Sequence, residues 1–195
     1  MQPQQKNNMA GSSQNCLRII GGQWRGRKLS FAKVDAIRPT PDRVRETLYN
    51  WLAPTIHGAS CLDLFTGSGA LGFEALSRGA ASVVMCDTNA KIISTLKDHA
   101  AVLKTNEAVF IQADALSFLN RNTQKFDLIF LDPPFDSDLL EKCFALIEQK
   151  SCLNDDAMIY VEAHSKEALP TVPENWLLHR DKKAGDVAYY LFKTK

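Results

Sequence analysis

The stretch Asp63-Leu64-Phe65-Thr66-Gly67-Ser68-Gly69-Ala70-Leu71-Gly72 separates an apolar run at residues 60–65 from a helical pattern at residues 70–77. Gly67 and Gly69 allow a tight backbone turn and the close approach of a ligand to the main chain, and Gly72 allows the helix to lie close to the strand. The stretch therefore predicts a strand, a glycine-rich loop and a helix. By itself this pattern is equally typical of a dinucleotide site and of other cofactor sites.

The rest of the chain predicts an α/β protein with a Rossmann-like architecture. Further apolar runs at 82–86, 109–112, 126–131 and 158–162 alternate with helical patterns at 90–103, 115–121 and 138–149. Such alternation is typical of βαβ units around a mostly parallel sheet, here with seven strands. The last two runs, 176–180 and 187–193, flank a short turn without a helix between them, which predicts an antiparallel C-terminal hairpin.

The first part of the chain predicts a small extension to this sheet. Residues 1–16 are rich in Gln, Asn and Ser and predict a disordered tail. Runs at 17–22 and 27–31 surround a glycine-rich turn and predict a small β-hairpin. Thr40 is expected to cap a helix that starts at Pro41 and stops at Pro54. The expected organisation is thus a tail at 1–16, an extension at 17–54 and a cofactor-binding domain at 55–195.

A carboxylate four residues before the first glycine narrows the choice of cofactor. Asp63 would repel the pyrophosphate of a dinucleotide, whereas it would favour an ammonium or a sulfonium group, and S-adenosylmethionine carries both. Asp87, at the end of the next run, can accept hydrogen bonds from ribose hydroxyls, and Asp114 can meet the adenine amine beside the Ala115 N–H. The alternative is that Asp87 and Asp114 only cap the following helices. The expected cofactor contacts are Asp63, Phe65, Gly67, Gly69, Asp87, Asp114 and Ala115.

The sequence Asp132-Pro133-Pro134-Phe135 follows the buried run at 126–131 and predicts a rigid, non-helical turn. The Asp132 carboxylate and the Pro133 carbonyl are two acceptors that suit an –NH2 group. Hydrogen bonds to both N–H groups favour a pyramidal nitrogen whose lone pair faces an electrophilic methyl group. Phe135 can stack on a base. The alternative is an ordinary turn with Phe135 in the core.

Length and composition restrict the class of protein. The chain has 195 residues, 45% of them hydrophobic, which fits one domain and excludes a collagen, a disordered chain or a disulfide scaffold. Five widely spaced cysteines without a C-x-x-C pair predict neither a disulfide framework nor a metal site. The sequence has no signal-peptide pattern and no apolar stretch of bilayer-spanning length. A cytoplasmic monomer is therefore expected.

The net charge of +1 hides an uneven distribution. Residues 1–55 hold nine basic and three acidic residues, a balance of +6, whereas residues 56–195 hold fourteen and nineteen, a balance of −5. The basic extension is either a surface for an RNA backbone or a solvated hairpin with Trp24 packed on the domain. The expected RNA contacts are Arg18, Arg25, Arg27, Lys28, Arg38, Arg43 and Phe135, and Arg45 belongs to the same basic cluster.

These residues resemble an S-adenosylmethionine-dependent methyltransferase of the amino-group type. Further motifs occur in the order seen in the bacterial 16S ribosomal RNA guanine-N2 methyltransferase family, and the resemblance covers about residues 17–192. It implies methyl transfer to the exocyclic N2 of a guanine in 16S ribosomal RNA or the small ribosomal subunit, with S-adenosylhomocysteine as product. The chain departs from the family at Thr66, usually Ala, and at Asp87, usually Glu. The motifs are Arg18-Ile19-Ile20-Gly21-Gly22, Arg25-Gly26-Arg27-Lys28-Leu29, Arg38-Pro39-Thr40, Asp42-Arg43-Val44-Arg45-Glu46, the glycine loop, Glu74-Ala75-Leu76-Ser77-Arg78-Gly79-Ala80 and Asp132-Pro133-Pro134-Phe135.

Four other functions share part of this pattern. Adenine-N6 methylation of DNA uses similar chemistry but normally needs a large target-recognition domain, for which 195 residues leave no room. Methylation of a protein glutamine is usually marked by Asn-Pro-Pro-Tyr. A nicotinamide-dependent oxidoreductase is disfavoured by Asp63 and by the lack of a Tyr/Lys or His catalytic pair. A non-catalytic RNA-binding module is disfavoured by the intact Asp132-Pro133-Pro134-Phe135.

Overall fold

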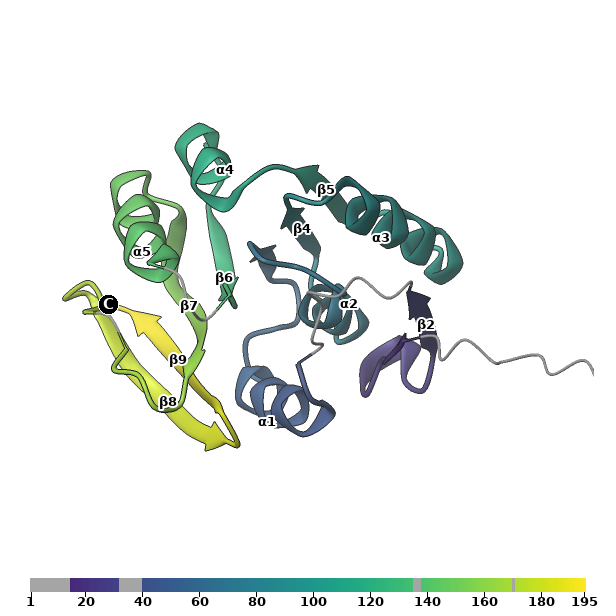
Figure 1. Ribbon diagram of the computed structural model, residues 1–195, viewed down its shortest axis with the longest axis horizontal. Coiled ribbons are helices and arrows are strands. Elements are labelled where there is room, and N and C mark those ends of the chain that lie inside the picture. Colours follow the sequence, from purple (N-terminus) through teal and green to yellow (C-terminus); the bar gives the residue numbers. More distant parts are fainter. Residues whose placement is uncertain (1–14, 32–39, 135–137, 170) are drawn as a thin grey trace, which may run out of the picture.

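A computed structural model describes residues 15–31, 40–134, 138–169 and 171–195 (Figure 1). Its main feature is a seven-stranded sheet in the order β5-β4-β3-β6-β7-β9-β8, and a separate two-stranded sheet pairs β1 with β2. The expected fold class is confirmed, including the C-terminal hairpin and the small N-terminal sheet. The strands are β1 Asn15–Arg18, β2 Lys28–Phe31, β3 Ser60–Asp63, β4 Ser82–Asp87, β5 Ala108–Gln112, β6 Phe126–Leu131, β7 Leu153–His164, β8 Trp176–Ala184 and β9 Val187–Thr194.

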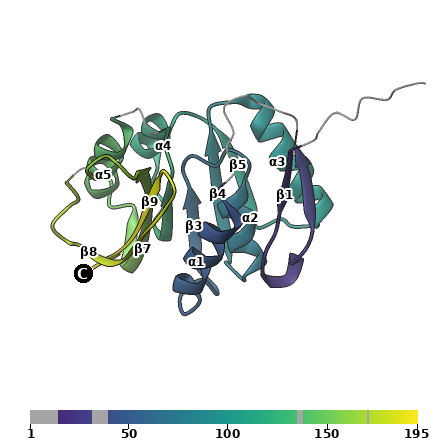
Figure 2. The same ribbon diagram turned by 60° about the horizontal axis from the view of Figure 1, so that its bottom comes forward.

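Helices cover both faces of the large sheet, as expected of a parallel sheet. The helices are α1 Asp42–Leu52, α2 Ala70–Ser77, α3 Ala90–Leu103, α4 Ala115–Arg121 and α5 Leu139–Gln149, with a short 3-10 helix at Gly22–Trp24. One buried cluster joins α1, α2, α3 and the N-terminal hairpin to one face, and a second joins α4 and α5 to the other face. Figures 1 and 2 show this layered arrangement.

The C-terminal ends of the parallel strands all lie along one side of the sheet, across the strands rather than along an outermost strand. β3, β4, β5, β6 and β7 all run in the same direction, so their carboxyl ends lie together. We call this side the carboxyl edge. Each of α1, α2 and α3 leads to or from these strands and runs back across the sheet, so α2 begins at the carboxyl edge and ends at the opposite edge. Ligands of open α/β sheets bind outside the carboxyl ends of the strands.

The start of α1 differs from the prediction. The helix begins at Asp42 with Pro41 in the N-cap position, and no side chain caps it, so the expected capping by Thr40 is wrong. Thr40 is buried, and its hydroxyl hydrogen-bonds instead to the Glu162 carboxyl at the end of β7. The Thr40 hydroxyl thus donates to a distant carboxyl instead of accepting from a backbone N–H of the helix. The helix also ends at Leu52, before Pro54 is reached.

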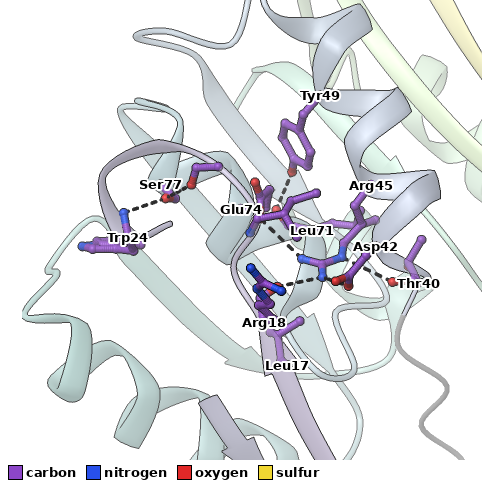
Figure 3. Close-up of polar contacts among 12 residues, drawn as sticks. Leu17, Arg18, Trp24, Thr40, Asp42, Arg45, Tyr49, Leu71, Glu74 and Ser77 are labelled. Atoms are coloured by element: carbon purple, nitrogen blue, oxygen red, sulfur yellow. Dashed lines mark hydrogen bonds and ion pairs between the residues drawn. The ribbon is translucent and has the colours of Figure 1, made fainter. Parts of the chain in front are cut away.

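The N-terminal hairpin is attached to α2 by buried polar contacts (Figure 3). The Ile20 N–H donates to Glu74 Oε2 at 2.9 Å, and the Trp24 N–H donates to Ser77 Oγ at 3.0 Å. Trp24 is buried in the core, as the alternative interpretation of this residue expected. Arg45 of α1 bridges the same region, since it donates to the Arg18 carbonyl at 2.7 Å and pairs with Glu74.

Arg45 is only 1% exposed, so it does not belong to the basic surface with which the sequence grouped it. Its charge is used inside the protein, opposite Glu74 and Asp42. Among the described residues, no helix is long and apolar enough to cross a membrane.

Candidate active site

The glycine loop between β3 and α2 lies at the carboxyl edge. Gly67 and Gly69 have φ values of +48° and +77°, in the left-handed region that favours glycine. A Cβ added to Gly69 would lie 2.7 Å from the side chain of Leu96 and 2.8 Å from that of Phe73. The conformation and the packing thus both require glycine at position 69, and the N-terminus of α2 follows directly.

Asp63 supports this loop from inside the protein. It is 2% exposed, and its Oδ2 accepts hydrogen bonds from the Gly72 N–H at 3.1 Å and from the Thr66 hydroxyl at 2.9 Å. Burial raises the pKa of this carboxyl to about 7, although the two hydrogen bonds act in the opposite direction. Thr66, the departure from the family pattern, therefore supplies a donor that the usual Ala would lack.

Asp87 connects the end of β4 to the same loop. Its Oδ2 accepts from the Gly67 N–H at 3.1 Å and its Oδ1 accepts from the Asn89 N–H at 2.9 Å. The residue that caps α3 is Asn89, whose side chain accepts from Lys91 N–H, so the capping alternative is wrong for Asp87. The half-buried Asp87 carboxylate lies beside the glycine loop, where a ribose could meet its remaining lone pairs.

Asp114 and Ala115 lie at the start of α4, beyond the end of β5. The exposed Asp114 caps this helix, because its Oδ1 accepts from the Ser117 N–H at 2.9 Å. The capping alternative is thus confirmed for Asp114, and hydrogen bonds from the side chain and then the backbone of Ser117 lower the pKa of its carboxyl. The structure brings Asp63, Asp87 and Asp114 to the ends of three neighbouring strands, β3, β4 and β5.

The Asp-Pro-Pro turn leaves β6 directly beside β3. Pro133 is buried and Pro134 exposed, while Phe135 lies outside the described residues. Burial, followed by the charges of Glu162 and Asp63, raises the pKa of the Asp132 carboxyl well above its usual range. The turn thus presents a half-buried carboxyl at the carboxyl edge, next to the strand that leads into the glycine loop.

One acidic residue of this site was missed by sequence reasoning. Glu162, near the end of β7, is 3% exposed and accepts a hydrogen bond from the Tyr160 hydroxyl at 2.8 Å. Burial raises the pKa of Glu162 to about 7. The signal was present in the sequence as a carboxylate at the end of an otherwise apolar run, on the strand next to Asp132.

The expected RNA contacts fall into two groups. Arg43 is exposed in the first turn of α1, close to the carboxyl edge because Thr40 bonds to Glu162. Arg25 and Arg27 are exposed near the turn of the hairpin, where Arg27 donates to the Val102 carbonyl near the end of α3, at the opposite edge.

Arg18 and Lys28, two further expected RNA contacts, lie on the strands of the N-terminal hairpin. Arg18 and Lys28 are exposed and face each other across β1 and β2. Arg38 lies outside the described residues. The structure thus brings Arg43 to the carboxyl edge and leaves Arg25 and Arg27 away from it.

The chemistry of the site suits a positively charged cofactor. Asp63, Asp132 and Glu162 have raised pKa values because burial and their mutual repulsion disfavour their charged forms. A cation placed among them would relieve this repulsion, whereas a phosphate would add to it. The residues present therefore fit S-adenosylmethionine better than a dinucleotide. No group of three or more His, Cys, Asp or Glu among the described residues is arranged to hold a metal ion.

Together, the strand order, the glycine loop after β3 and the C-terminal antiparallel hairpin define a class I methyltransferase fold. The family model described as "Conserved hypothetical protein 95" matches residues 17–193. The chain belongs to this family of S-adenosylmethionine-dependent ribosomal RNA methyltransferases.

Relatives and solved structures agree with this assignment. The chain is 50% identical over 190 residues to "Ribosomal RNA small subunit methyltransferase D" of Escherichia coli K12, covering 97% of this chain and 95% of that protein. It is 45% identical to the protein of the same name from Haemophilus influenzae, covering 91% and 94%. The solved structure of yhhF from Escherichia coli superimposes with a TM-score of 0.86 at 48% identity, covering 93% of this chain and 99% of that one.

Proposed function

We propose that this protein transfers a methyl group from S-adenosylmethionine to the exocyclic N2 of a guanine in 16S ribosomal RNA. The observation that carries the proposal is the Asp132-Pro133-Pro134 turn, which leaves β6 beside the glycine loop at the carboxyl edge. The name of the relatives in Escherichia coli and Haemophilus influenzae supports ribosomal RNA of the small subunit as the substrate. The choice of guanine N2 rests on the resemblance in sequence.

In this proposal the acids of the carboxyl edge hold the cofactor. Asp87 accepts from the ribose hydroxyls, and Asp114 and the Ala115 N–H meet the adenine, while Gly67 and Gly69 let the backbone approach the ligand. Phe65, half-buried in the loop, packs against it. Asp63 favours the positively charged end through its field, since its carboxyl already accepts from Gly72 and Thr66. When bound, the cofactor supplies an electrophilic methyl group.

The catalytic turn acts on the amine of the base. Asp132 and the Pro133 carbonyl accept its two N–H groups, which favours a pyramidal nitrogen with its lone pair directed at the methyl group. Phe135 stacks on the face of the base, a contact worth about 1–3 kcal/mol in single-stranded nucleic acids. A guanine in folded RNA must be unstacked to reach this turn.

We further propose a division of labour along the chain. Residues 17–54 face the RNA, and residues 55–195 hold the cofactor and the amine. The exposed Arg18, Arg25, Arg27, Lys28 and Arg43 support this division, and Arg38 is expected to act with them. Contacts to phosphates make binding salt-dependent, so the affinity for RNA should fall as the salt concentration rises.

The substrate is tested by labelled methyl transfer offered in parallel to 16S ribosomal RNA, small ribosomal subunits, DNA and protein. Nucleoside analysis of the product should show N2-methylguanosine from RNA or subunits. N6-methyladenine in DNA, or a methylated glutamine, would contradict the substrate and would leave the methyltransferase class intact. No methyl transfer to any of the four would contradict the proposed function.

The role of the turn is tested by Asp132→Ala. The variant should bind the cofactor with nearly the affinity of the wild type in calorimetry but lose about 10²-fold or more of its turnover, the usual effect of a removed transition-state contact. Asp138→Ala is the matched control, because Asp138 lies six residues beyond Asp132, is exposed and forms an exposed ion pair with Lys142. Near wild-type turnover of Asp132→Ala would overturn the role given to this residue.

A further inference from the structure

Glu162 lies beside Asp132 because of the register of the sheet. β6 and β7 pair in parallel up to Leu131 and Val161, so Asp132 and Glu162 follow as neighbours on adjacent strands. On the other side of β6, Asp63 is the partner of Phe130 at the end of β3. Three carboxyl groups thus come from the ends of three neighbouring strands, β3, β6 and β7, at the carboxyl edge.

The Glu162 carboxyl is held by two hydroxyl groups. Oε1 accepts from the Tyr160 hydroxyl at 2.8 Å, and the Thr40 hydroxyl bonds to the same carboxyl. Both donors favour the ionised form. Since Thr40 lies immediately before α1, Glu162 also connects the end of β7 to the point where the N-terminal extension enters its helix.

Among the residues that the structure describes, the groups that face this pair of carboxyls are acidic or neutral. Asp132 comes from β6, Asp63 from β3, Tyr160 from β7 itself, Tyr189 from β9 opposite Glu162, and Thr40 from the segment before α1. Glu162 is buried and Asp132 is half-buried, so in the ligand-free protein the two carboxyls cannot both carry a charge without a cost. The two donors on Glu162 decide which of them keeps it.

We propose that Glu162 is a positioning residue that controls the charge of Asp132: it retains the negative charge of the pair and keeps Asp132 protonated in the ligand-free protein. This inference rests on the proposed function for the identity of the amine. Asp132 loses its proton to water when a cationic cofactor lies nearby and the N–H groups of the base provide donors, because both offset the second negative charge. The burial that raises the pKa of Asp132 supports this order of events.

The proton balance of the reaction is then complete. Methyl transfer forms an N–C bond and breaks the S–C bond, so the amine nitrogen gains a positive charge and must release one proton. The Asp132 carboxylate, beside the Glu162 anion, takes up that proton and returns the pair to its starting state with one proton and one negative charge. No further base is required.

The test is a titration of the Asp132 carboxyl by ¹³C NMR in the cofactor-free protein, assigned with Asp132→Asn. In Glu162→Gln the neutral amide keeps an acceptor for the two hydroxyls but carries no charge, so Asp132 should titrate at lower pH than in the wild type. The acidic limb of kcat against pH should shift in the same direction, by about one unit or more, as for two strongly coupled carboxyls. Glu167→Gln, at an exposed position three residues beyond the end of β7, is the control and should leave both measurements unchanged.

A second variant covers a failure of Glu162→Gln to fold. Tyr160→Phe removes one donor to Glu162, which moves the proton of the pair toward Glu162, so Asp132 should again titrate at lower pH, by less than in Glu162→Gln. An Asp132 titration that stays unchanged in a folded variant would overturn the inference. The NMR measurement needs no RNA, so it remains decisive even if the wild type methylates none of the four substrates.

Discussion

Removal of the Glu74 carboxylate should strongly destabilise the protein, because Glu74 connects three parts of the chain. Its oxygens accept from the Ile20 N–H at 2.9 Å, from Arg78 Nε at 2.8 Å and from Arg45 Nη1 at 3.4 Å. Figure 3 shows the contact between Glu74 and Arg45. Glu74 is 0% exposed and Arg45 is 1% exposed. In Glu74→Ala the guanidinium of Arg45 stays buried while one of its two carboxylate partners is lost.

The magnitude follows from what remains around Arg45. Breaking a buried ion pair from one side costs about 3–5 kcal/mol. Arg45 keeps Asp42 Oδ1 at 2.6 Å and the carbonyls of Arg18 and Thr40, which places the expected loss near the lower value, about 3 kcal/mol. For a chain of this size, that loss lowers the melting temperature by about 6–12 °C.

Urea denaturation followed by circular dichroism measures this loss directly. Glu46→Ala is the control, since Glu46 is exposed on the same extension and should change the free energy of unfolding by less than about 0.5 kcal/mol. In addition, Glu74→Leu combined with Arg45→Met should cost less than the sum of the two single changes, because no charge is left buried. A loss below 1 kcal/mol for Glu74→Ala, or strict additivity in the double variant, would refute this account of the contact.

Three further predictions concern the backbone, pH and the RNA surface. Gly22→Ala should cost at least about 1–3 kcal/mol more in urea denaturation than Gly26→Ala, because both have positive φ but only a Cβ at Gly22 meets a backbone carbonyl, 1.8 Å away at the end of α2; equal costs would contradict this. Burial raises the pKa of Asp63 to about 7, so the free energy of unfolding of the wild type should fall, relative to Asp63→Asn, as the pH rises from 4 to 7. The expected fall is on the order of 4 kcal/mol in denaturation curves, and parallel pH profiles of the two proteins would contradict it. Arg43→Ala should raise the KM for RNA more than Arg25→Ala, since only Arg43 lies near the carboxyl edge, and the reverse order in steady-state kinetics would count against that placement.

Much of the sheet could be predicted because its strands are short apolar runs between clear turn signals. The bounds of α2, α3, α4 and β6 agree with the predicted ranges. β7 extends from Leu153 to His164, well beyond the predicted 158–162, because pairing with β6 and β9 recruits polar residues that have no strand pattern of their own. Local pattern predicted where the strands lie, and pairing decided how far they run.

The site residues that sequence reasoning misjudged all depend on partners distant in the chain. Thr40 has the local features of a helix cap, yet its hydroxyl donates to Glu162, which is distant from it in the chain. Arg45 belongs by its neighbours to a basic surface, yet Glu74 draws it into the interior. Glu162 occurs in an apolar run, and only the pairing of β7 with β6 places it next to Asp132. In each case the sequence names a polar group and the fold decides its partner.

The positions of the charges also give the neutral sum of the chain a physical meaning. Arg45, one of the basic residues of the extension, is buried in an ion pair with Glu74. The charge that faces solvent there is therefore smaller than the +6 counted for residues 1–55. Three acids of the body, in contrast, lie at the carboxyl edge: Asp63 and Glu162 are buried, Asp132 is half-buried, and the pKa of each is raised. A stable fold gains nothing from gathering three carboxyls in one place, and each raised pKa is a cost in free energy. Such a cost is typical of a functional site, because a cationic ligand and an incoming amine are the groups that would relieve it.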